Sequence, residues 1–275
     1  MTVRRGISTL VAAVLAAGAV VLAPQPAYAA TGNPYRGYDI SWPQCPSDVG
    51  IPGRMGKDRP LPPPTTGFVV VGLTNGPGFT RNPCIETHLA FVRSHRIPFA
   101  AYAMTTFPTS AQLHAYGAAG PYSTATLSGR LSNAGVAEAR FNVWTMRALK
   151  IRSPIVWVDV EHYAPWDWTA SQQMNRAFLR GVIREYRAAG YRVGFYSSPY
   201  MWGSIIGAGG PRGYPEWRSA GARGADVAWN RCAPSHAFQG GTAVLAQWWD
   251  DVNDYDLVCR AFRTPTALAR WFVQT

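Results

Sequence analysis

The chain has 275 residues, a formal net charge of +11 at pH 7, and no Ser/Gly-rich linker that would divide it. This length fits one large α/β barrel or two small domains, and the missing linker favours one domain. The arginines that carry the charge are scattered and form no basic stripe with interleaved aromatics. The charge therefore argues against a nucleic-acid-binding protein and favours attraction to an anionic cell wall or membrane surface.

The first 29 residues have the three zones of a secretory signal. Arg4 and Arg5 precede an apolar stretch over residues 10–22, and a small-residue sequence follows that ends at Ala29. The stretch is too short and too rich in Ala and Gly for a membrane span, and no later segment is long enough. We therefore expect cleavage after Ala29, a secreted or cell-envelope location, and a single mature domain over residues 30–275. The paired arginines leave the export route open.

Apolar runs and helical periodicity alternate through the next part of the chain. Strands are predicted at residues 37–42, 67–73, 99–104, 155–161 and 192–196. Helices are predicted at residues 83–96, with Asn82 as the cap, at 132–150, and from a Thr169–Gln172 capping box to Gly190. Further along, short strands are predicted near residues 226–229, 243–248 and 255–258, and a final helix over 265–273.

The first five strands are nearly continuous in apolar residues, which indicates a parallel sheet covered by helices on its faces. We predict an α/β fold: a TIM-like (β/α) barrel of about five βα units, closed by three further strands. An open, doubly wound sheet is the alternative, but no Gly-rich phosphate loop follows the first strand.

Residues 155–161 read Ile-Val-Trp-Val-Asp-Val-Glu, an apolar strand that ends in two carboxylates. Side chains alternate sides along a strand, so Asp159 and Glu161 project the same way, about 6 to 7 Å apart along the chain. Two acids this close repel each other, and one tends to keep its proton near neutral pH. The pair is a candidate for acid catalysis. The alternative is a structural pair bonded to loop amides or arginines.

Other polar and aromatic residues are expected near this pair, because the C-terminal ends of parallel barrel strands meet at one rim. The residues expected there are Asp39, Ser41, Trp42, Gln44, Tyr196, Ser197, Ser198, Gln247, Trp248, Trp249, Asp250, Asp251, Asp254 and Asp256. The chain also holds 11 tryptophans, whose flat faces suit sugar rings. Trp166 and Trp168, in the loop just past the acid pair, are candidates for ligand contact, whereas Trp144 and Trp271 are assigned to packing.

All four cysteines lie in the predicted mature part, as expected for disulfides in an exported protein. Of three possible connectivities, we favour Cys45 with Cys84 and Cys232 with Cys259, because each pair lies just beyond neighbouring predicted strands. Each bond should stabilise the fold by roughly 3 to 4 kcal/mol. No CxxC pair or His-rich spacing supports a zinc site, and we predict no metal or organic cofactor.

Several short motifs now occur together and in order: Gly37-Tyr38-Asp39-Ile40-Ser41-Trp42, Asp159-Val160-Glu161, Tyr196-Ser197-Ser198, and Gln247-Trp248 with Asp256. In this combination the chain resembles the family 25 glycoside hydrolases, which are peptidoglycan-cleaving lysozymes. It is more closely similar to actinobacterial exported proteins described as glycoside-hydrolase-like, which share the Asp-Ile-Ser-Trp-Pro-Gln-Cys opening. The resemblance implies a flattened barrel of five strand–helix units with three further strands.

The resemblance also implies an activity, the hydrolysis of the bond between N-acetylmuramic acid and N-acetylglucosamine. Glu161 would donate a proton to the leaving sugar oxygen, and Asp159 would orient the acetamido group or stabilise positive charge. Asp39 and Asp256 would support them as further catalytic residues. Trp42, Tyr196, Trp166, Gln247 and Trp248 would bind the substrate.

Departures from the family pattern concern the substrate contacts. The usual Thr-Glu-Gly is replaced by Thr74-Asn75-Gly76, the usual Tyr-His-Phe by Tyr102-Ala103-Met104, and the Trp-x-Ala-x-Tyr pattern is altered at residues 226–229. A different glycan substrate, or a barrel that only binds the cell wall, therefore remains an alternative. A Ser–His hydrolase that uses Ser197 and His162 is disfavoured, because no Gly-x-Ser-x-Gly elbow surrounds the serine.

Overall fold

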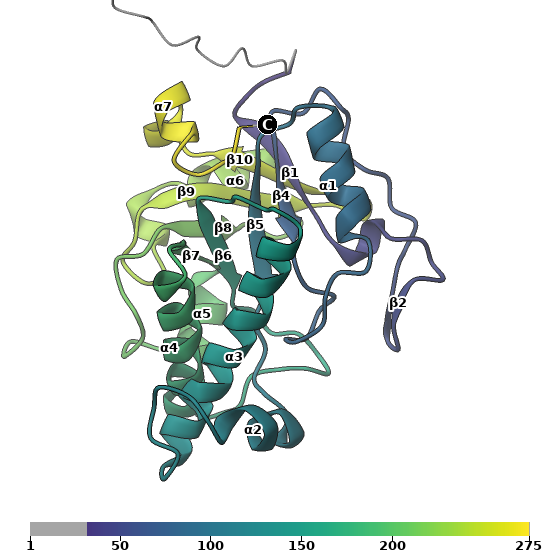
Figure 1. The fold of residues 1–275 in the computed structure, drawn as a ribbon. Helices are drawn as coiled ribbons and strands as arrows, with labels where there is room; N and C mark the ends of the chain where they lie inside the picture. Colours follow the sequence, from purple (N-terminus) through teal and green to yellow (C-terminus); the bar gives the residue numbers. More distant parts are fainter. Residues whose placement is uncertain (1–31, 275) are drawn as a thin grey trace, which may run out of the picture.

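Eight strands close into one barrel in the computed structural model, which describes residues 32–274. Around the barrel the order is β1, β4, β5, β6, β7, β8, β9, β10 and back to β1 (Figure 1). The predicted barrel class, with five strand units and three closing strands, is thereby confirmed. The strands are β1 (Arg36–Ile40), β4 (Phe68–Gly72), β5 (Phe99–Met104), β6 (Ile155–Asp159), β7 (Arg192–Ser197), β8 (Glu216–Ser219), β9 (Ala243–Trp249) and β10 (Asp254–Val258).

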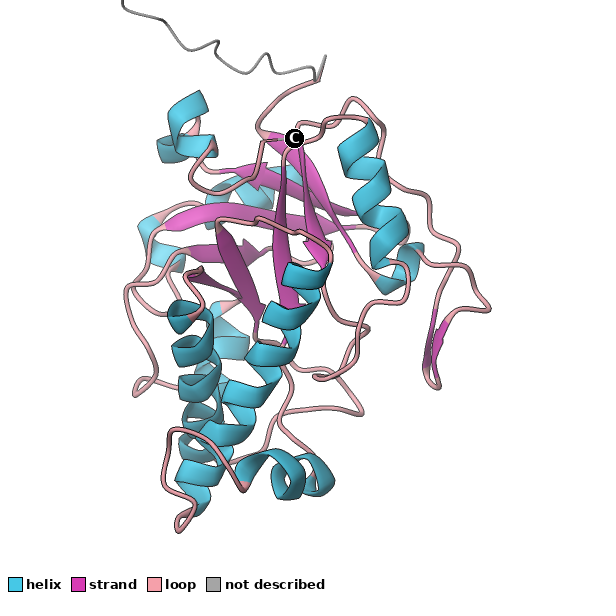
Figure 2. Ribbon diagram, viewed as in Figure 1, coloured by secondary structure: helices cyan, strands magenta, loops and turns pink. Residues whose placement is uncertain are grey.

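The helices flank the strands on the outside (Figure 2). They are α1 (Ile85–Ser94), α2 (Ser110–Gly117), α3 (Leu127–Ala148), α4 (Gln172–Ala188), α5 (Pro199–Ile205), α6 (Ala225–Arg231) and α7 (Pro265–Leu268). Short 3₁₀ turns lie at Trp42–Gln44, Pro234–His236 and Arg260–Phe262, and a small hairpin joins β2 (Gly50–Ile51) to β3 (Arg54–Met55). None of the helices within residues 32–274 combines the length and apolar character that crossing a bilayer requires. The predicted export signal, residues 1–29, lies outside the described residues.

The last strand runs opposite to the others. Neighbouring strands from β1 through β4 to β9 are parallel, whereas β10 is antiparallel to both β9 and β1. The C-terminal ends of seven strands therefore share a rim with the N-terminal end of β10. In the β1–β10 register, Asp39 lies opposite Asp254, so this reversal brings an acid to the rim that a parallel strand would have placed at the other end.

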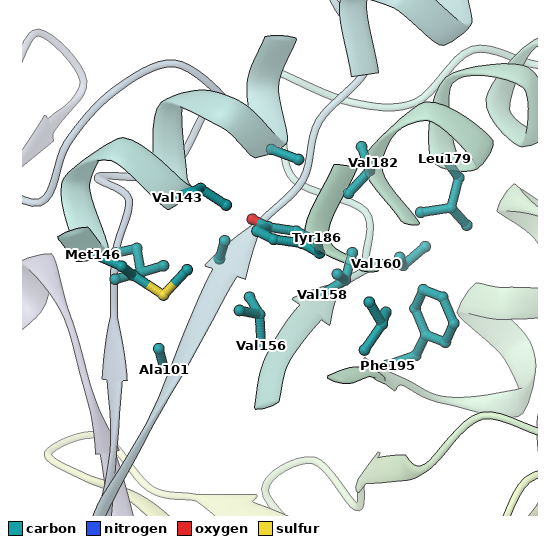
Figure 3. Packing of buried hydrophobic residues seen from close by; sticks show 14 of the residues in the cluster. Ala101, Val143, Met146, Val156, Val158, Val160, Leu179, Val182, Tyr186 and Phe195 are labelled. Atoms are coloured by element: carbon teal, nitrogen blue, oxygen red, sulfur yellow. The ribbon is translucent and has the colours of Figure 1, made fainter. Parts of the chain in front are cut away.

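Two layers of apolar side chains hold the barrel and its helices together. Val156, Val158 and Val160 point outward from β6 and its extension toward Tyr186 and Val182 of α4 (Figure 3). The neighbouring side chains of β6 point into the barrel, as strand alternation requires. The buried interior cluster includes Phe68, Val70, Ala100, Ile155, Trp157, Tyr196 and Trp217.

Helices α3 and α4 lie side by side against the barrel (Figure 1). Their close approach depends on glycine, because a Cβ added to Gly181 would lie 1.9 Å from the carbonyl oxygen of Ser132. A Cβ on Gly135 would similarly lie 2.1 Å from the carbonyl oxygen of Phe178. The two glycines let the helix backbones touch where larger residues would hold them apart.

Several local predictions need correction. The segment near residues 226–229 is not a strand but α6, which begins after Gly224 at φ +81 and carries Asp226 in its first turn. Helix α4 is capped by Ser171 rather than by Thr169, because the Ser171 hydroxyl accepts from the Met174 amide. The final helix stops at Leu268, since Val273 is extended and pairs with Phe99 of β5.

Further elements were not predicted: the β2–β3 hairpin between β1 and β4, strand β8, and the short helices α2 and α5. Strand β8 is hard to find by its apolar pattern, because it contains the fully buried ion pair Glu216–Arg218, with Nε to Oε2 at 2.6 Å. Further donors satisfy that pair, including the backbone amides of Gln239 and Gly241.

Both predicted disulfides are present. Cys45–Cys84 and Cys232–Cys259 have Cα–Cα distances of 5.7 and 5.6 Å. The first closes the loop that contains the β2–β3 hairpin, and the second joins the end of α6 to the end of β10. The predicted pairing is confirmed, and the hairpin loop is thereby fastened beside the barrel rim.

Candidate active site

A cavity of about 210 Å³ opens at the rim formed by the C-terminal ends of the parallel strands. Its walls combine carboxylates with aromatic rings, and they draw on residues from strands and loops that are far apart in the sequence. The lining residues are Asp39, Ser41, Trp42, Pro43, Tyr102, Met104, Asp159, Glu161, Tyr163, Tyr196, Trp217, Gln247, Trp249 and Asp254.

The acid pair that stood out in the sequence lies in this cavity, together with Asp39 from β1. Asp159 is the last residue of β6, and Glu161 follows two residues beyond the strand, on the same side. Asp256 lies one layer deeper and is fully buried, where its Oδ1 accepts a 2.7 Å hydrogen bond from Trp217 Nε1. The structure thus brings all four predicted acids together, with Asp256 beneath the cavity rather than in its wall.

Of the predicted substrate-binding residues, Trp42, Tyr196 and Gln247 line the cavity. Tyr196 OH donates to Gln247 Oε1 at 2.6 Å, and Gln247 Nε2 donates to Asp39 Oδ2 at 2.8 Å. This relay fixes the amide of Gln247 and gives one oxygen of Asp39 a partner. It joins β7, β9 and β1 across the barrel mouth.

The predicted place of Trp248 in the substrate site needs correction. Its ring stacks on Tyr255 at a centroid distance of 5.2 Å, with the Arg36 guanidinium 5.1 Å from its ring centroid, and it does not line the cavity. Because side chains alternate along β9, the cavity receives Gln247 and Trp249 instead. Trp249 is 42% exposed at the mouth.

Trp166 lies beside the mouth and is not among the lining residues. It stacks on Tyr163 at 6.1 Å and lies 5.4 Å from the Arg54 guanidinium. Arg54 comes from the hairpin, contacts the face of Tyr163 at 4.0 Å, and donates to the carbonyl oxygen of Ala164 at 2.7 Å. The hairpin therefore closes one side of the site with a cation held between aromatic rings.

Two contributors were not assigned a role from the sequence. Asp254 lines the cavity because β10 is antiparallel, and its two-residue spacing from Asp256 places both acids on the same side of that strand. That spacing was the available signal. No sequence pattern pointed to Arg54, because it reaches the rim only through the loop that the Cys45–Cys84 disulfide closes.

Burial and mutual repulsion raise the pKa values of the inner acids. Desolvation raises the pKa of Asp39, Asp159 and Asp256 well above the usual range, and neighbouring carboxylates raise each one further. Asp39 accepts from Gln247 and Asp256 accepts from Trp217, and the mutual charge of Asp39 and Asp256 adds to the rise in the pKa of Asp256. Oδ1 of Asp159 is buried without a hydrogen-bond partner among the described residues, and the Asp159 side chain lines the cavity.

The pKa of Glu161 is shifted toward neutral pH. Burial and then the charge of Asp254 raise its pKa to about 7, while the Arg54 guanidinium opposes the shift. Burial also raises the pKa of Asp254 to about 6, against the effect of Arg59. A carboxyl that exchanges its proton near neutral pH, beside acids with different proton affinities, can act as a general acid.

The arrangement does not assemble the serine hydrolase that Ser197 and His162 allowed. Ser197 Oγ donates to the carbonyl oxygen of Val160 at 2.7 Å, whereas His162 contacts Asp167 and Ser204. One set of possible metal ligands lies close together, Cys45, Cys84 and His88. Its two cysteines form a disulfide and cannot supply thiolates.

Comparison with known protein sequences gives partial matches. A protein-family model described as Lysozyme-like protein 1 matches residues 122–217, which include Asp159 and Glu161. The chain is 34% identical over 62 residues to Lysozyme-like protein 5 of Caenorhabditis elegans, covering 22% of this chain and 27% of that protein. It is 35% identical over 65 residues to Probable GH family 25 lysozyme 4 of Dictyostelium discoideum, covering 23% and 29%. Each match thus spans less than a third of the relative's length.

Solved structures match over nearly the whole barrel. A muramidase from Acremonium alcalophilum aligns with TM-score 0.52 and 14% identity over 86% of this chain and 99% of that one. A glycosyl hydrolase 25 of Streptococcus pneumoniae aligns with TM-score 0.51 and 12% identity over 88% and 94%. At these identities the likeness concerns the fold. Together with the sequence matches, it confirms that the chain resembles the family 25 lysozymes.

Proposed function

We propose that this protein is an exported glycoside hydrolase that cleaves cell-wall glycan of the peptidoglycan type, in the manner of a muramidase. The observation that carries the proposal is Glu161, whose pKa lies at about 7 in an aromatic-walled cavity with three further acids on its walls. Hydrolysis of a glycoside needs a protonated carboxyl for the leaving oxygen and a second group that stabilises the oxocarbenium-like transition state. The cavity offers both.

In this proposal Glu161 donates its proton to the glycosidic oxygen. Asp159 lies on the same side, where its carboxyl group accepts from the acetamido N–H of the sugar or stabilises the positive charge that develops on the ring. Asp39 is held by Gln247 and lies above buried Asp256, and these two acids support Glu161 and Asp159. The glycosidic C–O bond breaks, water adds to the anomeric carbon, and the proton that this water releases restores the carboxyl group of Glu161.

The walls of the cavity suit a sugar ring. Trp42 and Trp249 lie at the cavity with indole faces that can stack on the apolar face of a pyranose. Tyr102, Tyr196 and Trp217 pack edge to face beneath, with Trp217 centroids 5.7 and 4.7 Å from the two tyrosine rings. A rigid aromatic floor fixes where the sugar sits relative to Glu161.

Export is supported by the cysteines. All four form disulfides in the fold, which is typical of proteins that mature in an oxidising compartment outside the cytoplasm. This agrees with the signal predicted over residues 1–29. A location in the cell envelope also fits a polymeric wall substrate and the positive net charge.

The test uses purified mature protein, residues 30–275, on defined muropeptides and insoluble peptidoglycan. We expect new reducing ends from the wild type, and a loss of more than about 100-fold in Glu161→Gln, since one proton donor contributes about 10²–10⁴-fold. Glu86→Gln is the matched control, because Glu86 is an exposed glutamate of α1 that pairs only with Arg81 among the salt bridges of the described residues. The variant with Gln at position 161 should still bind peptidoglycan.

A second outcome would identify a non-catalytic module. If the wild-type protein binds peptidoglycan and releases no reducing ends at any pH from 4 to 8, the hydrolase proposal is wrong and the cavity serves wall binding. Equal activity of the wild type and Glu161→Gln would also refute the role of Glu161.

A further inference from the structure

A second cavity lies away from the acidic site and shares no lining residue with it. It has a volume of about 460 Å³ and lies between helices α3 and α4 and the loop at residues 209–214. Its lining residues are Ser128, Gln173, Arg176, Ala177, Arg180, Ile183, Gly209, Gly210, Pro211 and Tyr214. No carboxylate is among them.

The charges of this groove are arginines without acidic partners. Arg176, Arg180 and Arg184 recur every four residues on α4, and none of them forms a salt bridge within residues 32–274. Like charges at this spacing are neighbours on a helix surface and repel each other. The three guanidinium groups therefore concentrate positive charge that an anion would neutralise.

Neutral partners hold the three guanidinium groups in place. Arg176 Nη1 donates to the carbonyl oxygen of Ile206 at 2.7 Å, and Arg180 Nη2 donates to Ser132 Oγ at 2.7 Å. Arg180 and Arg184 both lie over the ring of Tyr122, at 5.2 and 5.9 Å. These contacts use few of the five N–H donors of each guanidinium. The remaining donors are positioned for a ligand before it arrives.

We propose that this groove, with the adjoining Arg184, binds a phosphodiester-linked polyanion of the cell wall. Arginine forks fit phosphate oxygens through paired hydrogen bonds. Four residues of helix rise span about 6 Å, so the three arginines start from a row of positions along α4. In an extended poly(glycerol phosphate), successive phosphorus atoms are six bonds apart, which is about 7 Å. A polymer with one charge per repeat therefore matches the row.

This proposal does not depend on hydrolysis by the acidic cavity. It explains part of the positive net charge by the arginines of the groove. Binding to the wall and hydrolysis of the glycan would then use two different sites. Each phosphate contact would release counterions, so binding should weaken steeply as salt rises.

The test measures binding of the mature protein to poly(glycerol phosphate) at several salt concentrations. In the variant Arg176→Gln, Arg180→Gln, Arg184→Gln we expect the Kd to rise by at least about 10-fold. The slope of log K against log salt should fall by about 2, for three lost contacts of about 0.7 each. The control replaces three exposed arginines elsewhere, Arg147, Arg152 and Arg270, by Gln and loses the same net charge. It should change the Kd by less than about threefold. Both variants should keep the wild-type melting temperature, which shows that they fold.

Three results would overturn the proposal: an unchanged Kd in the α4 variant, an equal loss in the control variant, or tighter binding of a single-stranded oligonucleotide than of poly(glycerol phosphate). The second result would reduce the effect to net charge, and the third would assign the groove to nucleic acid.

Discussion

Replacing Asp254 should move the pH dependence of the proposed glycosidase activity in a defined direction. Asp254 is the charged neighbour that most strongly raises the pKa of Glu161, after burial itself. The full shift is from 4.5 to about 7. Because burial is the larger cause, we assign the Asp254 charge about 1 pH unit of it. In Asp254→Asn the pKa of Glu161 should therefore fall from about 7 to about 6.

The direction of the pH effect on activity follows from the proposed role of Glu161 as a proton donor. A general acid works in its protonated form, so activity is lost as pH rises through its pKa. With a pKa of about 7, half of the Glu161 carboxyls hold a proton at pH 7, and with a pKa near 6 about a tenth do. Asp254→Asn should thus lose about fivefold in kcat/KM at pH 7 and little at pH 5.

Arg54→Met provides the opposing test. The Arg54 guanidinium lowers the pKa of Glu161, so its removal should shift the alkaline limb to higher pH. The assay is the release of reducing ends from a soluble muropeptide between pH 4 and 9, with both variants beside the wild type. Shifts of both variants in the same direction, or no shift in either, would refute the electrostatic account of Glu161.

The remaining predictions concern the fold. Gly181→Ala should destabilise the protein by about 1 to 3 kcal/mol, because the new Cβ would overlap the carbonyl oxygen of Ser132, and thermal unfolding should show it as a lower melting temperature. Gly203→Ala, in a helix position with no atom within 4 Å of the new Cβ, should leave the melting temperature unchanged or higher. Asp256→Asn should be more stable than the wild type at pH 7, and this advantage should shrink toward pH 4, as urea unfolding at the two pH values would show. Its folded pKa is raised by burial, so the wild-type acid loses stability as pH rises above its unfolded value, whereas Asn can still accept from Trp217. An advantage that grows toward pH 4 would contradict this.

The sequence was sufficient for features that depend on local pattern. The apolar run of β6 with Asp159 and Glu161 at its end predicted both a buried strand and two acids on one side, because alternation is a property of the strand itself. The same rule, applied to β9, shows why Trp248 was misassigned. Gln247 was expected in the cavity, so its neighbour had to point the other way.

Helix boundaries were predicted less well where two caps compete. Thr169 and Ser171 are both good N-cap residues, and the Thr169 side chain is instead bonded to the amide of Ser171. Strand β8 escaped prediction because its buried residues are charged, and only the tertiary structure supplies the amides and carbonyls that satisfy Glu216 and Arg218.

By itself, the sequence determined the barrel, the acid pair and the disulfide pairing, since each depends on short-range periodicity or on the order of neighbouring strands. The tertiary structure alone decided that β10 runs antiparallel, which carries Asp254 to the cavity, and that the hairpin brings Arg54 beside Tyr163. It also packs the loop at residues 209–214 beside α3 and α4, which forms the groove next to Arg176 and Arg180. These features depend on how distant segments meet when the barrel closes, and no local pattern encodes that meeting.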